Sequence, residues 1–164
     1  MSEPGGSGLP RAAAPVELSA RMSGPSGAPV LVLGNSLGTT MELWEPQLDA
    51  LGRRFRLLRY EHRGHGGSPA PPGPYAISDL GADVLALLDE FEVATAYYAG
   101  VSLGGMVGMW LAANAPDRTA AARSRQSCTG CSHGEVQHSA SAAIRPGALA
   151  ASHMPTMPPS DTPQ

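Results

Sequence analysis

Short apolar runs alternate with longer amphipathic segments between residues 30 and 115. The run Val30–Leu33 is continuous, is closed by Gly34, and predicts a strand buried on both faces, as in a parallel sheet. Residues 55–60 and 94–99 predict two further strands. The weak alternation of residues 16–21 predicts a short edge strand.

Three segments between or after these strands have helical character. Residues 41–51 space their apolar side chains three, four and three positions apart, and residues 77–91 gather them on one face with the aspartates off it. Residues 103–115 form a third apolar segment that stops at Pro116. Each segment predicts a helix.

Strands that alternate with helices predict the α/β class, with right-handed crossovers and a parallel sheet. Functional side chains in such sheets gather at the carboxyl ends of the strands. In this chain those ends are the loops that begin at Gly34, Glu61 and Gly100.

Large apolar residues are unevenly distributed along the chain. Val, Ile, Leu, Phe, Trp and Tyr occupy 29 of the 90 positions in 29–118 but only three of the 46 positions in 119–164. Residues 1–15 are rich in Gly, Pro and Ala without periodicity. We therefore expect one folded region, residues 16–118, between a disordered leader, residues 1–15, and a low-complexity, disordered tail, residues 119–164.

Composition excludes several classes of function. All eleven basic residues are arginine. The lack of lysine excludes a lysine-dependent phosphate loop, and it also excludes Schiff-base chemistry. The net charge of −3 does not indicate a nucleic-acid partner. No apolar run reaches the ~20 residues of a membrane span, and the first 30 residues show no secretion signal. We expect a cytoplasmic protein without a membrane partner.

Two cysteines and two histidines of the tail superficially suggest a metal site. They are Cys128, Cys131, His133 and His138. A zinc site normally separates its two ligand pairs by a dozen or more residues, whereas these are nearly contiguous. We interpret the pattern as chance in a low-complexity segment, and we expect no metal and no disulfide framework.

The segment Gly100-Val101-Ser102-Leu103-Gly104 is a G-x-S-x-G motif between a predicted strand and a predicted helix. In such a sharp turn the serine hydroxyl projects into the cleft, and the elbow glycines, Gly100 and Gly104, remove Cβ atoms that would clash. The start of the helix offers free N–H groups to a developing oxyanion. Ser102 is therefore the candidate nucleophile, with the Leu103 N–H as one oxyanion donor.

The loop after Val30–Leu33 predicts the second donor. It reads Gly34-Asn35-Ser36-Leu37-Gly38-Thr39 and stands where hydrolases with this motif place it, so the backbone N–H of Leu37 is the candidate. The alternative is a turn that Asn35 and Ser36 merely cap. Asn35, Ser36 and Trp44 are also candidates for lining a substrate pocket.

Residues 16–118 resemble the N-terminal half of an α/β-hydrolase, and within that superfamily they are similar to bacterial 3-oxoadipate enol-lactonases. The matching segments are Asn35–Thr39, Trp44, Tyr60–Gly66, Pro72–Tyr75, the Leu80–Phe91 helix and Gly100–Gly108. Esterases and cofactor-free haloperoxidases share much of this half. The expected fold is thus a truncated α/β-hydrolase.

The resemblance implies a hydrolase of small-molecule lactones or esters that needs no cofactor, and specifically conversion of an enol-lactone to 3-oxoadipate in the degradation of aromatic compounds. In the family, a serine attacks the lactone carbonyl, a histidine relays the proton, and water releases the acyl-enzyme. Arg63 could hold the substrate carboxylate, but we favour a structural role because the Arg-Gly-His-Gly turn is usually structural in this superfamily.

The acid and the histidine of the expected triad are not found. They should follow the serine in the order acid, then histidine, but His133, His138 and His153 lie in the tail and precede Asp161. His62 and His65 lie on the correct edge of the sheet, and we interpret both as loop-packing residues rather than as the base. We therefore expect little or no turnover.

The resemblance ends at Arg118. Without the strands that would follow there, we expect the elbow strand 94–99 to be an exposed edge of the sheet. Our hypothesis is a frameshift or truncation of the coding sequence there, which an apolar strand encoded in another frame would support. Three functions remain open: an inactive relative of the hydrolases, a non-catalytic interaction module, and an enzyme that another chain completes.

Overall fold

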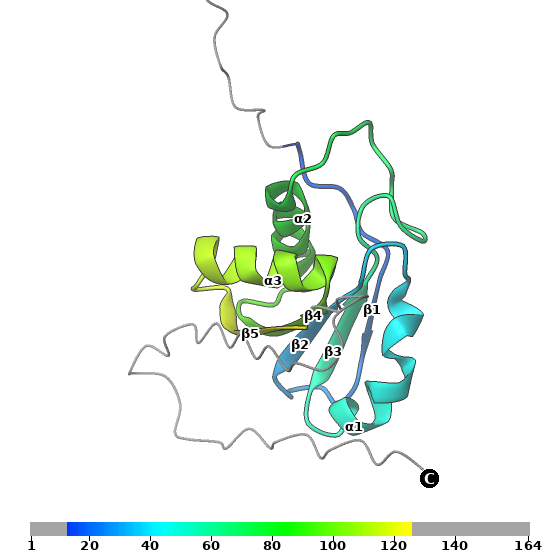
Figure 1. Cartoon of the computed structure of the whole chain (residues 1–164). Coiled ribbons are helices and arrows are strands. Elements are labelled where there is room, and N and C mark those ends of the chain that lie inside the picture. Colours follow the sequence, from blue (N-terminus) through cyan, green and yellow to red (C-terminus); the bar gives the residue numbers. More distant parts are fainter. Residues whose placement is uncertain (1–12, 126–164) are drawn as a thin grey trace, which may run out of the picture.

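A computed structural model of the chain describes residues 13–125 as a five-stranded sheet with helices on both faces (Figure 1). The elements in chain order are β1 (Ala20–Ser23), β2 (Val30–Gly34), the 3-10 helix η1 (Met41–Gln47), α1 (Leu48–Gly52), β3 (Arg56–Tyr60), α2 (Ile77–Glu90), β4 (Ala96–Val101), α3 (Leu103–Asn114) and β5 (Thr119–Arg125).

The strand order in the sheet is β1-β3-β2-β4-β5. Strand β2 pairs in parallel with β3 and with β4, and β4 pairs in parallel with β5, while β1 is antiparallel to β3 at the edge. The α/β class and the mostly parallel sheet predicted from the sequence are confirmed. The carboxyl ends of β2, β3 and β4 consequently lie together at one end of the sheet.

Alternate side chains of β2 supply two separate cores. Val32 faces α2 and α3 within the larger core, which also contains Val84 and Val107. Leu31 and Leu33 face the opposite side, where Trp44, Leu48, Leu51 and Phe55 pack against them and Leu57. Figure 1 shows the same division, with α2 and α3 on one side of the sheet and α1 on the other.

The helix predicted over 41–51 consists of two short pieces, η1 and α1. Pro46 lies inside η1, and a proline lacks the N–H that an α-helix needs and clashes with the preceding turn. The chain accommodates Pro46 in a 3-10 segment and turns α-helical at Leu48. The apolar spacing predicted the correct buried face, because Trp44 and Leu48 contact the smaller core.

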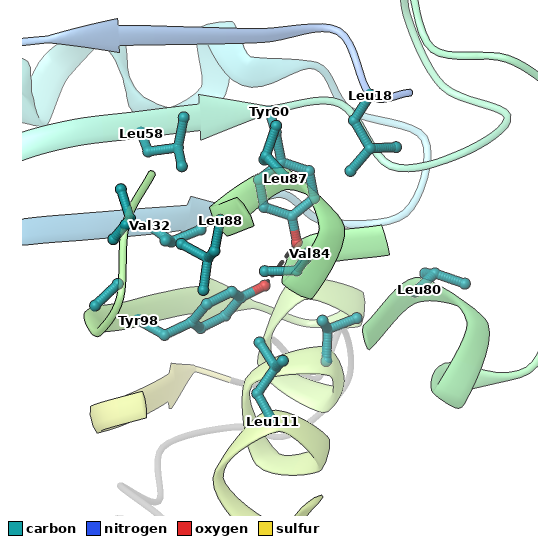
Figure 2. Packing of buried hydrophobic residues seen from close by; sticks show 13 residues of the cluster. Leu18, Val32, Leu58, Tyr60, Leu80, Val84, Leu87, Leu88, Tyr98 and Leu111 are labelled. Atoms are coloured by element: carbon teal, nitrogen blue, oxygen red, sulfur yellow. Dashed lines mark hydrogen bonds between the residues drawn. The ribbon is translucent and has the colours of Figure 1, made fainter. Parts of the chain in front are cut away.

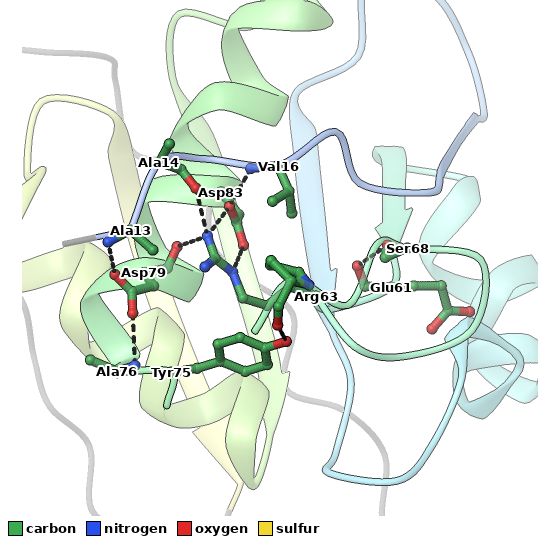
Figure 3. Close-up of polar contacts among 11 residues, drawn as sticks. Ala13, Ala14, Val16, Glu61, Arg63, Ser68, Tyr75, Ala76, Asp79 and Asp83 are labelled. Atoms are coloured by element: carbon green, nitrogen blue, oxygen red, sulfur yellow. Dashed lines mark hydrogen bonds and ion pairs between the residues drawn. The ribbon is translucent and has the colours of Figure 1, made fainter. Parts of the chain in front are cut away.

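The edge strand begins at Ala20, later than the predicted start at residue 16. Ala20 pairs with Tyr60, the last residue of β3, and one further backbone bond, from the Glu61 N–H to the Ser19 carbonyl oxygen, lies beyond this pair. Earlier residues bond to side chains: the Ala13 N–H donates to Asp79 and the Val16 N–H donates to Asp83 (Figure 3). Residues 13–15, predicted as part of the leader, thus lie against α2, and residues 1–12 lie outside the described range.

The chain continues past Arg118 as strand β5, where the sequence predicted the disordered tail. Strand β5 covers the side of β4 that we expected to be an exposed edge, with Ala99 opposite Arg123. Strand pairing uses backbone groups, and the small side chain of Ala122 still packs on the larger core, so no large apolar residue is required. Residues 126–164, with both cysteines and the predicted tail histidines, lie outside the described residues.

Within residues 13–125, no helix is long and apolar enough to cross a membrane. The same part of the chain holds no group of three or more His, Cys, Asp or Glu side chains that could bind a metal ion.

Two buried phenols meet in the larger core. The hydroxyl oxygens of Tyr60 on β3 and Tyr98 on β4 lie 2.8 Å apart (Figure 2). Tyr98 fits against Gly34 and Gly108, where a Cβ atom would overlap its ring or hydroxyl. Burial raises the pKa of both phenols, so both remain protonated. One hydroxyl donates to the other across the β2 strand that lies between β3 and β4.

We expect Tyr98→Phe and Tyr60→Phe each to lower the free energy of unfolding by about 1–3 kcal/mol, because the remaining hydroxyl loses its partner in the core. The double variant should cost no more than either single variant, since both polar groups are then gone. Urea unfolding of the four proteins measures this coupling. Costs that simply add would show that the two hydroxyls do not depend on each other.

Candidate active site

Ser102 lies at the junction of β4 and α3 in a strained conformation. Its backbone has φ 52° and ψ −113°, a positive φ that is rare for a residue other than glycine. Such a conformation costs on the order of 1–3 kcal/mol and persists only where the surrounding structure enforces it. The strand-to-helix turn predicted from the G-x-S-x-G motif is therefore present.

Two glycines let the backbone close around this turn. A Cβ atom on Gly100 would lie 2.4 Å from the carbonyl carbon and oxygen of Gly104. A Cβ atom on Gly104 would in turn lie 2.3 Å from the carbonyl oxygen of Gly34 at the end of β2. Both distances are far below normal contact, so the motif glycines bring the elbow against the neighbouring loop.

A backbone hydrogen bond joins the elbow to that loop. The Gly104 N–H donates to the carbonyl oxygen of Asn35 at 2.9 Å. Among residues 13–125, the N–H groups of Leu37 and Leu103 have no acceptor, and Leu103 is the first residue of α3. The bond holds Asn35, at the base of the loop, against the start of α3, and the two-donor arrangement remains a prediction.

Asn35 occupies the base of this loop and is completely buried. Its Nδ2 donates to the carbonyl oxygen of Tyr60 at 2.8 Å, and its Oδ1 accepts from the Trp44 indole N–H at 3.0 Å. The side chain is therefore committed to joining three segments of the fold. This differs from the predicted pocket role of Asn35 and is closer to the structural alternative.

Ser36 and Trp44 also take part in the fold. The Ser36 carbonyl oxygen accepts from both the N–H and the hydroxyl of Thr39, which closes a tight turn. Trp44 is half-buried and packs on the smaller core. A role of Ser36 or Trp44 in binding substrate remains a prediction.

Sequence reasoning missed Glu61 as part of this site. Its side chain is buried below the loop, where Oε1 accepts from the Met41 N–H at 2.9 Å and Oε2 accepts from Asn35 Nδ2 at 3.3 Å. The carboxylate joins the end of β3 to the loop and to η1. Its position directly after a buried strand was the available signal.

His62 and His65 both brace loops, as their interpretation as packing residues predicted. His62 is buried and its Nε2–H donates to the Asn35 carbonyl oxygen at 3.1 Å. His65 Nε2 accepts from the Gly38 N–H at 3.0 Å, and its Nδ1–H donates to the Arg63 carbonyl oxygen at 3.2 Å. The two rings therefore carry their hydrogens on different nitrogens.

Burial lowers the pKa of His62 from 6.5 to about 4. The unfolded chain binds a proton here below pH 6.5, whereas the folded chain does so only near pH 4, so acid favours unfolding in that window. We expect His62 to account for a loss of roughly 3 kcal/mol of unfolding free energy between pH 6.5 and 4.

The variant His62→Gln keeps a donor and cannot titrate, so it should lack this part of the acid dependence. Chemical unfolding of both proteins from pH 7 to pH 4 measures the difference. Parallel curves for the two proteins would show that His62 titrates normally.

Arg63 forms a buried ion pair with Asp83 of α2 (Figure 3). Its Nε and Nη2 donate to the two carboxylate oxygens, each at 2.6 Å, and Nη2 also donates to the Ala14 carbonyl oxygen at 3.2 Å. The guanidinium lies 5.5 Å from the centre of the Tyr75 ring. The bonds to Asp83 raise the pKa of Arg63. The structural role favoured from the sequence is confirmed.

Among the described residues that follow Ser102 in the chain, Asp117 is the one acidic residue, and there is no histidine. Asp117 lies in the turn before β5, and β5 runs parallel to β4, so it stands at the end of the sheet opposite Ser102. Among residues 13–125, the elbow serine is therefore followed by no histidine, and by no acid at its own end of the sheet.

Comparison with known proteins gives a consistent assignment. A family model for the alpha/beta hydrolase fold matches residues 29–137, which extends beyond the expected end of the resemblance at Arg118. The 3-oxoadipate enol-lactonase 2 of Acinetobacter baylyi is 41% identical over 103 residues, which are 63% of this chain and 39% of that protein. A putative carbamate hydrolase of Caulobacter segnis is 38% identical over 95 residues, 57% of this chain and 36% of that protein.

A solved structure gives the same picture. The enol-lactonase from Burkholderia xenovorans is 48% identical, with a TM-score of 0.64 over 65% of this chain and 42% of its own. The chain therefore spans about two fifths of the length of the relatives that it matches.

Proposed function

Because the chain belongs to the alpha/beta hydrolase fold family, we propose that it is the nucleophile-bearing part of a serine hydrolase for small-molecule lactones and esters. The observation that carries the proposal is the positive φ of Ser102 at an elbow that a hydrogen bond fastens to the Asn35–Thr39 loop. A strained serine at the start of a helix suits acyl transfer, with the Leu103 N–H and the Leu37 N–H of the adjoining loop, neither bonded among residues 13–125, as the donors.

In the proposed reaction, the Ser102 Oγ attacks the carbonyl carbon of the lactone, and its proton passes to solvent water, from which the departing enolate oxygen is later protonated. The Leu37 and Leu103 N–H groups donate to the oxyanion that forms. The intermediate collapses with cleavage of the ring C–O bond, which gives an acyl-serine and a free enol. Water then attacks the acyl carbon, and the acid leaves as Ser102 recovers its proton.

The proposed substrate class is an enol-lactone such as 3-oxoadipate enol-lactone, in the degradation of aromatic compounds. Support comes from the enol-lactonases of Acinetobacter baylyi and Burkholderia xenovorans, at 41% and 48% identity. Other esters are the alternative, and the similarity to a putative carbamate hydrolase makes carbamates a further class to assay.

We propose that this chain alone turns over substrate slowly. His62 and His65 are both occupied in bracing loops, and the described residues after Ser102 provide no base. An oxyanion hole and substrate binding without a complete triad still give about 10³–10⁴-fold acceleration over water. The alternatives are an interaction module without catalysis and an enzyme that a second chain supplies with its acid and histidine.

A fluorophosphonate probe tests the nucleophile directly, because it reacts covalently with an activated serine. We expect slow but complete labelling of the chain, with one label per molecule and complete loss of labelling in Ser102→Ala. Ser36→Ala is the matched control, since this serine lies in the neighbouring loop, and it should remain labelled. No labelling of the natural chain, or equal labelling of Ser102→Ala, would contradict the proposal and favour an interaction module.

A further inference from the structure

We infer that His65 is a positioning residue that holds the Ser36–Thr39 loop, and with it the Leu37 N–H, in place beside Ser102. The inference rests on the proposed function, because Leu37 matters there as an oxyanion donor. His65 itself does not touch the reacting atoms.

In the hydrogen bond between Gly38 and His65, the loop is the donor and the histidine ring is the acceptor. The Gly38 N–H donates to His65 Nε2 at 3.0 Å, so Nε2 is the nitrogen without hydrogen. Nδ1 then carries the hydrogen and donates to the Arg63 carbonyl oxygen at 3.2 Å. The ring is thus held on one side by the backbone and offers its other nitrogen to the loop.

The backbone that holds the ring is itself rigid. Arg63 is fully buried, and its guanidinium is fastened to Asp83 of α2 by two bonds of 2.6 Å. The ring of His62 lies edge-on to that of His65 with 6.0 Å between centres, and it donates to Asn35 at the base of the loop. The loop is therefore braced at its base by His62 and at its tip by His65.

The tip needs this support because it has little of its own. Leu37 is 70% exposed and Gly38 has a φ of +72°, so side-chain packing contributes little there. The bonds from Thr39 end on Ser36, inside the same loop. Among the residues that the structure describes, the bond to His65 is the one hydrogen bond that joins Ser36–Thr39 to another segment.

Two variants separate the hydrogen bond from the volume of the side chain. His65→Leu fills similar space but accepts no hydrogen bond, whereas the amide oxygen of His65→Gln can accept from Gly38. In amide hydrogen exchange followed by NMR, we expect the Gly38 amide to exchange about five- to tenfold faster in His65→Leu and near the natural rate in His65→Gln. Nitrogen NMR of the natural chain should show hydrogen on Nδ1 of His65 and none on Nε2.

The rate at which the fluorophosphonate labels Ser102 measures how the loss of the His65 bond affects the site. We expect Ser102 in His65→Leu to be labelled about 10- to 100-fold more slowly than in the natural chain, and His65→Gln to restore the rate. The two variants should have the same melting temperature. A natural chain that is not labelled contradicts the proposed function, and the exchange rates then still decide whether His65 orders the loop. Equal exchange and labelling in His65→Leu and the natural chain would overturn the inference.

Discussion

Replacing Asp83 by leucine should lower the free energy of unfolding by about 3–5 kcal/mol, a large share of the stability of a domain of this size. The substitution leaves the Arg63 guanidinium fully buried without its carboxylate partner. It also removes the acceptor of the Val16 N–H, so residues 13–19 lose a contact with α2. Thermal and urea unfolding measure the loss.

Two controls identify the buried charge as the cause. The double variant Arg63→Met with Asp83→Leu removes both charges and should recover most of the loss, because a buried ion pair can be replaced by apolar side chains at little cost. Asp89→Leu removes a carboxylate of the same helix from an exposed pair with Arg118, and should cost less than about 1 kcal/mol. Similar losses for Asp83→Leu and Asp89→Leu would show that burial of the pair is unimportant.

Gly104→Ala is expected to disrupt both the fold and the site. The added Cβ atom would lie 2.3 Å from the Gly34 carbonyl oxygen and 2.9 Å from the Asn35 carbonyl oxygen. Both neighbours are backbone atoms that no rotamer change can move, so the cost should exceed the roughly 1–3 kcal/mol of ordinary overpacking. We also expect labelling of Ser102 to be lost, because the elbow must separate from the loop that carries Leu37.

The comparison for this variant is Gly52→Ala at the end of α1. A Cβ atom there meets only Leu57 Cδ1 at an ordinary 3.9 Å, so stability should change by less than about 1 kcal/mol and labelling should persist. Thermal unfolding followed by circular dichroism measures the stability of both variants, and the fluorophosphonate probe measures the labelling of Ser102. A Gly104→Ala protein that melts and labels like the natural chain would show that the close approach of elbow and loop is not required.

The elements that bury large apolar side chains could be predicted from the sequence. The run Val30–Leu33 and the helix face of 77–91 are specified by where apolar residues stand, and the structure has both within one residue at each end. Strand β5 could not be predicted, since its pairing is made by the backbone of a segment that lacks large apolar residues. Residues 13–15 were missed similarly, because their backbone bonds to side chains far away in the sequence, Asp79 of α2 and Arg63.

The site could be predicted where a short motif forces a conformation. The glycines around Ser102 require a tight turn, and the turn follows from their missing Cβ atoms. The network of Asn35, Glu61 and His65 could not be predicted, because those contacts span 26 or 27 positions along the chain. The Asn35 side chain, predicted to line a pocket, is hydrogen-bonded to Tyr60 and Trp44.

The most direct test of the oxyanion assignment is a proton–nitrogen NMR spectrum of the chain before and after Ser102 reacts with the fluorophosphonate. The phosphonyl oxygen of the adduct stands where the oxyanion would form, so we predict large downfield shifts of the Leu37 and Leu103 amide protons as they donate to it. Amides in the segment that precedes β4 at the opposite end of the sheet, such as those of Val93 and Ala94, should stay unchanged. An adduct on Ser102 that leaves the Leu37 and Leu103 amides unshifted would contradict the assignment.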